Sequence, residues 1–353
     1  MNKKIIMAAG GSGGHIYPAL ALAKAMQEKG NEVIFIGSLD RMEKDVIPTS
    51  GFPFIGLDIK TTRGSIIQKF KSLLSLFNAY FKCLKLLKGA DLVIGYGNYI
   101  SVPVILAGKK LKIKTVIHEQ NSYVGRANLF LDQKVDLVIG SYEENLKQFK
   151  NPNIVILGNP QSSLAASSTK DEDLLKELGL NPELKTVLIF FGSLGSESVN
   201  KVVLDYFKLT DDKYQIIYAT GTRNYEEAKD YQNEWIKIVE RIDGIRAMQD
   251  STLLLSRAGA TTIAEITAIG MPSILIPSPY VPNNHQYYNA KALSDKDAAI
   301  LLEEKDLDKD KLKSLIENLL DDDKRREEIS LNARKLGNPN VIEDILDRLD
   351  VWI

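Results

Sequence analysis

The chain has 353 residues, of which 44% are hydrophobic and 26% charged, and its formal net charge at pH 7 is -1. This composition is typical of a soluble globular protein, and the length favours two domains. The apolar run near the start gives way to glycines after residue 9, and no stretch approaches the ~20 apolar residues that span a bilayer. We therefore expect no signal peptide and no membrane-spanning helix.

The cysteine content and the charge distribution limit the cellular compartment and the kinds of ligand that the protein could bind. Cys83 is the only cysteine, which excludes an internal disulfide and a cysteine zinc cluster and favours the cytoplasm. Residues 1–160 hold 21 Lys+Arg against 12 Asp+Glu, and the remainder holds 24 against 34, so the two parts carry about +9 and -10. A basic half suits anionic lipid, phosphate substrates or nucleic acid, although scattered surface lysines give the same count.

Short β-branched runs alternate with amphipathic stretches in two successive sets, which predicts βαβ units and parallel sheets covered by helices. The expected strands are residues 5–8, 33–36, 92–94, 115–118 and 137–139, then 186–191, 215–219, 253–256, 273–276 and 299–302. We therefore expect an α/β protein with two Rossmann-like domains whose parallel sheets face an interdomain cleft.

The domain boundary is expected near residue 160. Residues 161–169 are polar and small, which suits an exposed linker. The C-terminal segment has apolar residues at helical spacing at Ile342, Ile345, Leu346 and Leu349. The expected domains are residues 1–160, joined by a C-terminal helix at 340–353, and residues 161–339.

A glycine-rich turn follows the first strand. Residues 10–15 read GGSGGH and precede a helix expected at 18–29, with Pro18 in its first turn. Glycines let the backbone approach a diphosphate, and a helix N-terminus offers unpaired N–H groups. Ile16 stands where a dinucleotide fingerprint needs glycine, so Gly10 and Gly11 indicate a different anion site, or serve only close packing.

Two further turns follow strands in the same way. Residues 95–99 read GYGNY, so Gly95 and Gly97 resemble a second anion-binding turn, and residues 192–196 read GSLGS. Such turns lie at the carboxyl ends of parallel strands, where open α/β sheets bind ligands.

The three histidines, His15, His118 and His285, all fall in or beside strand-end loops. His15 is the candidate general base, because a helix N-terminus disfavours the imidazolium and keeps a neutral, proton-accepting ring. Shaping the loop is the other interpretation. His118 opens the polar run HEQN, which a solvated loop also explains. No histidine pair has zinc-ligand spacing, so we expect no metal site.

Polar residues also cluster in the second half. Residues 257–262 follow an expected strand, and Glu265 lies in the next helix, where its carboxylate can accept hydrogen bonds from ribose hydroxyls. A helix-dipole role is the alternative for Glu265. Residues 282–289 supply several amides, which can read sugar hydroxyls or simply form a turn.

The segment at residues 66–88 combines apolar residues with five lysines, which is typical of an interfacial membrane helix. A core helix explains part of this pattern. The excess of apolar positions favours membrane contact through Phe70, Leu73, Leu74, Phe77 and Phe81.

In order and spacing, these motifs resemble the MurG family over nearly the whole chain. That resemblance implies the GT-B fold and inverting transfer of N-acetylglucosamine from UDP-N-acetylglucosamine to lipid I, the undecaprenyl-pyrophosphoryl-linked muramoyl pentapeptide, giving lipid II of peptidoglycan synthesis. It also implies peripheral attachment to the anionic inner face of the cell membrane, with roles in cell shape and division. No cofactor and no nucleic acid is expected.

The resemblance implies specific donor contacts and a ribose-binding role for Glu265. The residues concerned are Ser12, Gly13, Gly14, Asn121, Ser193, Ile242, Ala260, Thr261, Thr262, Ile263, Ala264, Glu265 and Gln286. The chain departs from the family pattern at Ser162, where arginine is common, at Asn98, where glycine is usual, and at Leu194, where glutamine is usual. The stretch at 242–251 is also shortened.

Three other functions stay open at this point. A related UDP-sugar transferase could use a different acceptor, and a UDP-N-acetylglucosamine 2-epimerase has similar architecture. The apolar segment at 66–88 argues against an epimerase, whose soluble substrate needs no lipid surface. A non-catalytic binding protein is the third.

Overall fold

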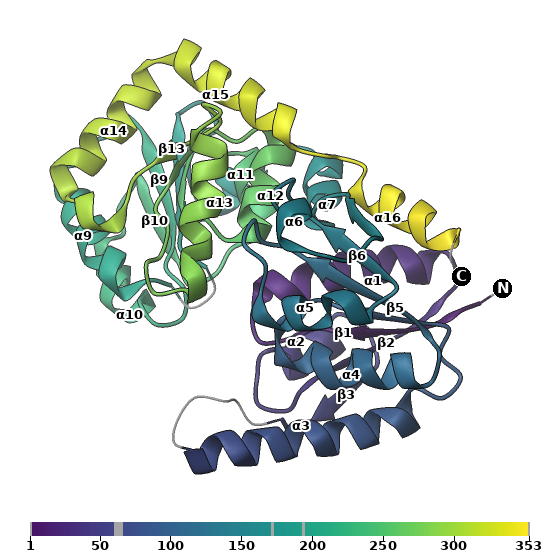
Figure 1. Cartoon of the computed structure of the whole chain (residues 1–353). Coiled ribbons are helices and arrows are strands. Elements are labelled where there is room, and N and C mark those ends of the chain that lie inside the picture. Colours follow the sequence, from purple (N-terminus) through teal and green to yellow (C-terminus); the bar gives the residue numbers. More distant parts are fainter. Residues whose placement is uncertain (1, 60–65, 171–172, 193–194, 352–353) are drawn as a thin grey trace. The chain divides into compact units, whose positions relative to one another are not determined.

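The computed structural model describes residues 2–59, 66–170, 173–192 and 195–351, and the chain divides into two compact units (Figure 1). Unit 1 comprises Met1–Gln161 and Asn340–Ile353, and unit 2 comprises Ser162–Pro339. The first boundary lies one residue after the expected one. Each unit is a parallel sheet with helices against it.

The unit 1 sheet has seven strands in the order β3-β2-β1-β4-β5-β6-β7, all parallel. Its strands are β1 Lys4–Ala8, β2 Glu32–Ser38, β3 Phe54–Leu57, β4 Leu92–Gly95, β5 Lys114–Glu119, β6 Leu137–Gly140 and β7 Ile154–Ile156. Its helices are α1 Gly13–Glu28, α2 Glu43–Thr49, α3 Ile66–Leu86, α4 Asn98–Lys110, α5 Arg126–Leu131, α6 Asn145–Gln148 and α16 Val341–Asp350.

Alternation along β1 builds two cores from one strand. Ile5 and Met7 pack in a cluster with residues of α1, α2 and α16. Ile6 and Ala8 pack in a second cluster with residues of α3 and α4. Successive side chains of a strand point to opposite faces, so a central parallel strand is apolar throughout.

Unit 2 contains a six-stranded parallel sheet in the order β10-β9-β8-β11-β12-β13. Its strands are β8 Thr186–Phe190, β9 Gln215–Ala219, β10 Ile236–Val239, β11 Leu253–Ser256, β12 Ser273–Leu275 and β13 Ile300–Leu301. Its main helices are α7 Gln161–Ser167, α8 Asp173–Glu177, α9 Glu197–Phe207, α10 Tyr225–Ala228, α11 Gly244–Gln249, α12 Ala260–Ile269, α13 His285–Ser294, α14 Lys309–Asp321 and α15 Asp323–Leu336. The largest core joins the sheet to α9 and α14.

The structure corrects two local expectations. Residues 161–167 form α7 with Ser162 and Ala165 buried, so this stretch is not an exposed linker. Its small side chains allow close packing, which composition alone does not distinguish from solvation. Helix α1 begins at Gly13, so Pro18 lies beyond the first turn. The glycines therefore form the first turn of the helix as well as the loop before it.

The C-terminal helix α16 belongs to unit 1. Val341, Ile345, Leu346 and Leu349 are buried in the cluster that α1 shares with the sheet. Lys29 after α1 forms an exposed ion pair with Asp350 at 3.6 Å. The chain thus returns to unit 1 after completing unit 2.

Candidate active site

In unit 1, the turns after β1, β2 and β4 meet at one edge of the sheet. β1 lies between β2 and β4. The chain continues from β1 to β2 on one side and later returns to β4 on the other, which makes a topological switch point. The glycine turn at residues 10–14 follows β1, and the turn at residues 96–98 follows β4. The two glycine motifs seen in the sequence are therefore neighbours.

These two turns contact each other directly. The side-chain amide of Asn98 donates a hydrogen bond to the carbonyl oxygen of Gly10. A β-carbon placed on Gly97 would lie 3.4 Å from Cδ2 of His15, so the imidazole packs against the Gly97 backbone. Nδ1 of His15 lies 3.0 Å from Oγ of Ser12. The structure thus brings together His15 and both diphosphate turns predicted from the sequence.

The backbone at these turns explains the glycines. Gly11 has φ of +86° and Gly97 has φ of +81°, a region that favours glycine. Ser12 is the N-cap of α1, and Gly13 and Gly14 open that helix. Their N–H groups precede the first turn of hydrogen bonds, which is the geometry of an anion site. Gly95 ends β4 and packs against Ser101 and Ile105.

His118 lies deeper than expected for a residue of a ligand-binding loop. Its side chain is 1% exposed and stacks on Tyr96, and its Nε2 lies 2.9 Å from the Gly158 carbonyl oxygen. Burial lowers the pKa of His118 to about 4, so the ring is neutral. The carbonyl only accepts, so Nε2 carries the proton and Nδ1 accepts from the Gln120 amide at 3.1 Å. His118 supports the strand end and presents no ring nitrogen to a ligand.

Glu119 organises the loop after β5. Its Oε1 accepts hydrogen bonds from the backbone N–H and the side-chain amide of Asn121 at 3.0 and 3.2 Å. Its Oε2 accepts from the Gly125 N–H and from the Asn128 amide, both at 2.9 Å. Asn121, an expected donor contact, is therefore held in place by a buried carboxylate. Sequence reading placed Glu119 in a polar cluster but gave it no role, and Asn128 carried no signal.

In unit 2, the corresponding switch point lies between β8 and β11. Gly195 follows β8 with φ of +77°, and a β-carbon there would lie 2.2 Å from the Thr220 carbonyl oxygen. Only glycine fits this turn. Ser193, an expected donor contact, and Leu194 lie outside the described residues.

Arg257 holds the turn after β11. Its guanidinium donates to the Ile276 carbonyl oxygen at 3.0 Å and to Oγ of Ser196 at 2.6 Å. It also pairs with the Glu304 carboxylate at 2.6 Å and lies over the ring of Phe191. Arg257 therefore ties the loops after β8, β11, β12 and β13 together at the candidate site.

Helix α12 carries six of the thirteen expected donor residues. Gly259 is its N-cap, and Ala260, Thr261 and Thr262 form its first turn, where N–H groups face outward from the helix end. The side chains of Ile263 and Ala264 are buried at 3% and 8% exposure. The side chains of those two residues pack the helix onto unit 2. Any contact that they make with the donor must therefore come from their backbone groups.

Glu265 is a buried carboxyl group. It is 9% exposed, and burial together with the charge of Asp243 raises its pKa to about 8. Asp243 caps α11 by accepting from the N–H groups of Ile245 and Arg246. Ile242 directly precedes Asp243 and is half-buried. Ile242 therefore belongs to a loop whose next residue, Asp243, acts electrostatically on Glu265.

The loop before α13 is held against the same edge. Oε1 of Gln286 accepts a hydrogen bond from the Ser278 N–H at 2.8 Å. The buried amide of Asn289 donates to the Ala258 carbonyl oxygen at 3.1 Å. Ser162, where the family commonly has arginine, is buried with its Oγ 3.5 Å from the Ala264 carbonyl oxygen. The short side chain of Ser162 thus packs against helix α12.

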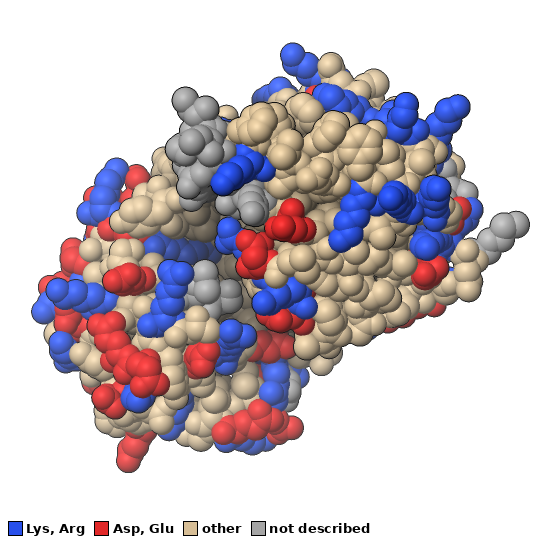
Figure 2. Space-filling view, turned by 90° about the horizontal axis from the view of Figure 1, so that it is seen from below, with Lys and Arg blue, Asp and Glu red and all other residues tan. Residues whose placement is uncertain are grey.

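Helix α3 has one face against unit 1 and one face exposed. Ala79, Cys83 and the following Leu87 are buried, and burial raises the pKa of the Cys83 thiol to about 12. The five expected membrane residues are all exposed: Phe70 65%, Leu73 65%, Leu74 52%, Phe77 59% and Phe81 49%. Figure 2 looks onto this side and shows an uncharged surface flanked by lysine and arginine side chains.

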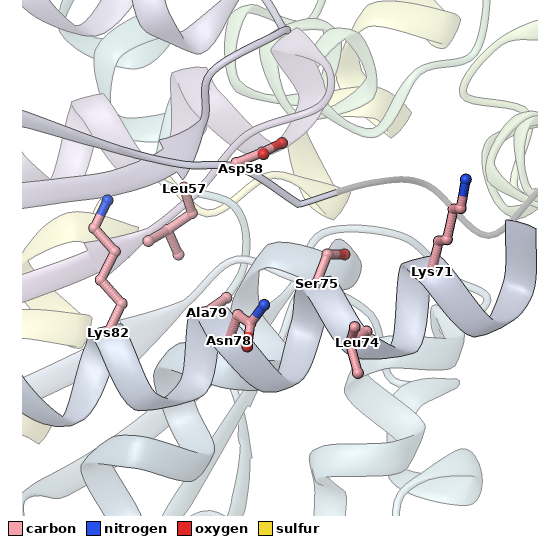
Figure 3. Close-up of a pocket in the computed structure, with 8 residues that line it drawn as sticks. All are labelled: Leu57, Asp58, Lys71, Leu74, Ser75, Asn78, Ala79 and Lys82. Carbon is pink, nitrogen blue, oxygen red and sulfur yellow. The ribbon is translucent and has the colours of Figure 1, made fainter.

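A pocket of about 370 Å³ lies between α3 and the end of β3. Lys82 extends from the helix toward Leu57, and Lys71 lies at the other end of the row of lining residues, as Figure 3 shows. Nζ of Lys82 donates to the Gly56 carbonyl oxygen at 3.1 Å. Basic groups thus stand beside the exposed apolar face.

In the part of the chain that the structure describes, no helix is both long and apolar enough to cross a membrane. Among the same residues, no group of three or more His, Cys, Asp or Glu side chains is arranged to hold a metal ion.

Comparison with known proteins defines the class. Residues 5–139 match the glycosyltransferase family 28 N-terminal domain, and residues 186–345 match the glycosyltransferase family 28 C-terminal domain. With two parallel Rossmann-like sheets, these matches define a glycosyltransferase of the GT-B fold.

The curated relatives indicate a more specific activity. An enzyme of Halothermothrix orenii named UDP-N-acetylglucosamine–N-acetylmuramyl-(pentapeptide) pyrophosphoryl-undecaprenol N-acetylglucosamine transferase is 39% identical, covering 97% of this chain and 98% of that protein. The enzyme of the same name from Pediococcus pentosaceus is 37% identical, with 98% of both chains covered.

The chain therefore belongs to the MurG family of N-acetylglucosamine transferases. The crystal structure of Acinetobacter baumannii MurG agrees, with a TM-score of 0.79, 26% identity and 99% of both chains covered. A UDP-GlcNAc 2-epimerase from Methanocaldococcus jannaschii has a TM-score of 0.64 at 14% identity, covering 99% of this chain and 100% of that one. That similarity shows the shared fold alone.

Proposed function

We propose that this enzyme transfers N-acetylglucosamine from UDP-N-acetylglucosamine to lipid I, forming lipid II for peptidoglycan synthesis. The observation that carries the proposal is full-length similarity, at 35–39% identity, to enzymes named for this reaction. The paired glycine turns in unit 1 and the α12 terminus with Glu265 in unit 2 support it. Through peptidoglycan, the activity would serve cell-wall biogenesis, cell shape and division.

The reaction forms one glycosidic bond and breaks another. The 4-hydroxyl of the acceptor muramoyl sugar attacks the anomeric carbon, the bond from that carbon to the diphosphate oxygen breaks, and UDP leaves with inversion. His15 takes the hydroxyl proton, and the N–H groups at the start of α12 stabilise the charge that develops on the leaving diphosphate. Glu265 holds the ribose hydroxyls. Ser12, Gly13 and Gly14 contact the donor, and the glycine turns at residues 10–11 and 95–97 hold the acceptor diphosphate.

We also propose that the enzyme works at the cytoplasmic face of the cell membrane, attached through the exposed apolar residues of α3. An apolar face bordered by lysines suits an anionic bilayer surface. An acceptor with an undecaprenyl chain remains in the bilayer, so surface attachment brings the reactive sugar to the enzyme.

The test is transfer of labelled N-acetylglucosamine from its UDP donor to a short-chain lipid I analogue. The wild type is compared with His15→Ala, Glu265→Ala and the control Asn31→Asp, which lies away from the glycine turns. We expect lipid II formation in the wild type and the control and losses of at least about 100-fold in the two site variants.

Two results would redirect the assignment. Donor epimerisation or hydrolysis without transfer by the wild type would replace lipid I transfer with another activity of this fold. Transfer to a different lipid but not to lipid I would keep the transferase and change its acceptor. We further propose that no metal is required, so activity should survive EDTA and should not need added magnesium.

A further inference from the structure

The peptide group between Gly10 and Gly11 is held at both ends by side chains from distant parts of unit 1. Its carbonyl oxygen, on Gly10, accepts a hydrogen bond from the amide of Asn98. Its N–H, on Gly11, donates to Oε2 of Glu43 at 3.0 Å. Asn98 begins α4 and Glu43 begins α2, so three separate segments fix one peptide plane.

Glu43 is suited to a fixed role because it is fully buried. Its Oε1 accepts from the N–H of Ser38 at 3.0 Å and from the Ser38 hydroxyl at 2.5 Å. A β-carbon on Gly10 would lie 2.3 Å from the same oxygen, so the glycine turn lies directly against the carboxyl group. A buried carboxylate is costly unless hydrogen bonds satisfy it, and here three donors do so.

Asn98 is equally specific. Its φ is +56°, a left-handed conformation that asparagine tolerates better than most residues. Its Oδ1 accepts from the Ile100 N–H at 2.8 Å while its amide reaches Gly10. Glycine would satisfy the backbone but make neither bond, and aspartate could make only the first. The asparagine at this usual glycine position therefore adds a link between the two glycine turns.

We propose that Glu43 and Asn98 are positioning residues for the transfer reaction, acting through the Gly10–Gly11 peptide group. That peptide directly precedes Ser12, Gly13 and Gly14 and the ring of His15. Rotation of the peptide would redirect the N–H groups of the glycine turn that contact substrate and would shift the base. The inference rests on the proposed function, in which these groups contact substrate. Small misplacements of reacting groups cost large factors in rate.

The decisive variants are Asn98→Asp and Glu43→Gln. Asn98→Asp keeps the bond to Ile100 and removes the donor to Gly10. Asn31→Asp is the matched control, because the Asn31 amide also donates to a carbonyl, on Met26, while its oxygen accepts from Lys3. We expect kcat/KM for the acceptor to fall about tenfold or more in each positioning variant and less than twofold in the control, with UDP binding retained.

The double variant separates positioning from general weakening. Both side chains hold one peptide group, so the combined loss should be clearly smaller than the product of the single losses. Strictly multiplicative losses, or a loss in Asn98→Asp no larger than in Asn31→Asp, would overturn the proposal. Equal unfolding midpoints for the two asparagine variants would exclude global destabilisation as the cause.

Amide hydrogen exchange gives a second readout that does not need activity. The exchange of the Gly11–His15 segment should speed up about tenfold or more in Asn98→Asp and Glu43→Gln, and should not change in Asn31→Asp. If wild-type protein failed to make lipid II, the proposed function would fall, and this exchange result would still decide whether the two residues fix the turn. Unchanged exchange would reject the positioning role of Glu43 and Asn98.

Discussion

The guanidinium of Arg257 lies 2.6 Å from the carboxylate of Glu304, and the two side chains are only 9% and 13% exposed. Arg257 follows β11 and Glu304 follows β13, so the pair bridges across β12 at the carboxyl ends of the unit 2 strands. Because water is largely excluded, loss of one partner leaves a charge that the other groups cannot fully compensate.

Replacement of Glu304 by alanine should lower the stability of unit 2 by about 3 kcal/mol and weaken UDP binding, because Arg257 would no longer be held beneath the α12 loop. Urea unfolding followed by the fluorescence of Trp235 measures this, in a Trp352→Phe background that leaves one tryptophan. The exposed pair Lys208–Asp205 serves as control, and Asp205→Ala should change little. Equal effects of the two substitutions would contradict a special role for the buried pair.

The raised pKa of Glu265 predicts that donor binding depends on pH. With a pKa of about 8, most of this carboxyl group is protonated at pH 7 in the free enzyme. The ionised form accepts both ribose hydroxyls, so UDP-N-acetylglucosamine should bind about 25-fold more tightly at pH 8.5 than at pH 6.5. Calorimetric titration checks this. Glu265→Gln should bind with little dependence on pH, and a steep dependence in that variant would implicate another group.

The same group should affect stability in the opposite direction. The folded state retains a proton that the unfolded chain releases near pH 4.5, so the contribution of Glu265 is greatest below that pH. It is lost as pH rises toward 8. Wild-type protein should therefore lose more stability than Glu265→Gln between pH 5 and 8.5, as urea unfolding at the two pH values would show. Parallel losses would mean that Glu265 ionises normally in the folded protein.

Membrane attachment can be tested on α3 without disturbing its packed face. Phe77→Ser and Phe81→Ser should each weaken binding to anionic vesicles by about tenfold, because inserted phenylalanine surface is lost. Leu331→Ser in unit 2 removes an apolar residue of similar exposure, 52% against 49% for Phe81, and should have no effect. Sedimentation with vesicles gives the affinities. A comparable loss from Leu331→Ser would place the contact elsewhere.

The buried face of α16 predicts a stability effect confined to unit 1. Ile345 is fully buried against α1 and the sheet, so Ile345→Ala should cost about 2–5 kcal/mol. Ile342→Ala, at a half-buried position, should cost less. Calorimetry should show that the unfolding temperature of unit 1 falls. The unfolding transition of unit 2, which Trp235 fluorescence identifies, should stay in place. Loss of both transitions together would mean that the units unfold as one.

The sequence was most informative about central strands. β1, β8 and β11 are buried on both faces, so they appear as nearly continuous apolar runs. Three strands were missed, β3, β7 and β10, and each is at the edge of its sheet. All residues of β7 are only partly buried. Its alternation and length are too weak to distinguish it from a loop, because half of its environment is solvent.

Helix α3 shows a second limit of periodicity. Phe70, Leu73 and Phe77 repeat at helical spacing, which also fits a core-facing row, and they are exposed, as membrane contact would require. The row that packs is Leu76, Ala79, Tyr80, Cys83, Leu84 and Leu87. The sequence contains two apolar faces, and packing against α4 and the sheet selects which one is buried.

At the candidate site, the motif residues could be predicted from the sequence, but the residues that hold them in place could not. The glycines before a helix, His15 and Glu265 were found because each has functional chemistry and follows an expected strand. Glu43 and Asn128 act through contacts with residues 32 and nine positions away, and neither has a local pattern that reveals it. Buried polar partners become visible only when the helices that carry them, α2 and α5, are placed against the strand ends.

The return of α16 has a consequence for synthesis on the ribosome. Domains generally fold as units, the N-terminal one first. Here the strands of unit 1 emerge first, but the apolar face that α1 shares with residues 341–349 stays uncovered until those residues have been made. Unit 2 is contiguous and has its whole sequence available earlier. The nascent chain therefore carries an incomplete first unit throughout the production of the second, and the ten-residue helix α16 completes it.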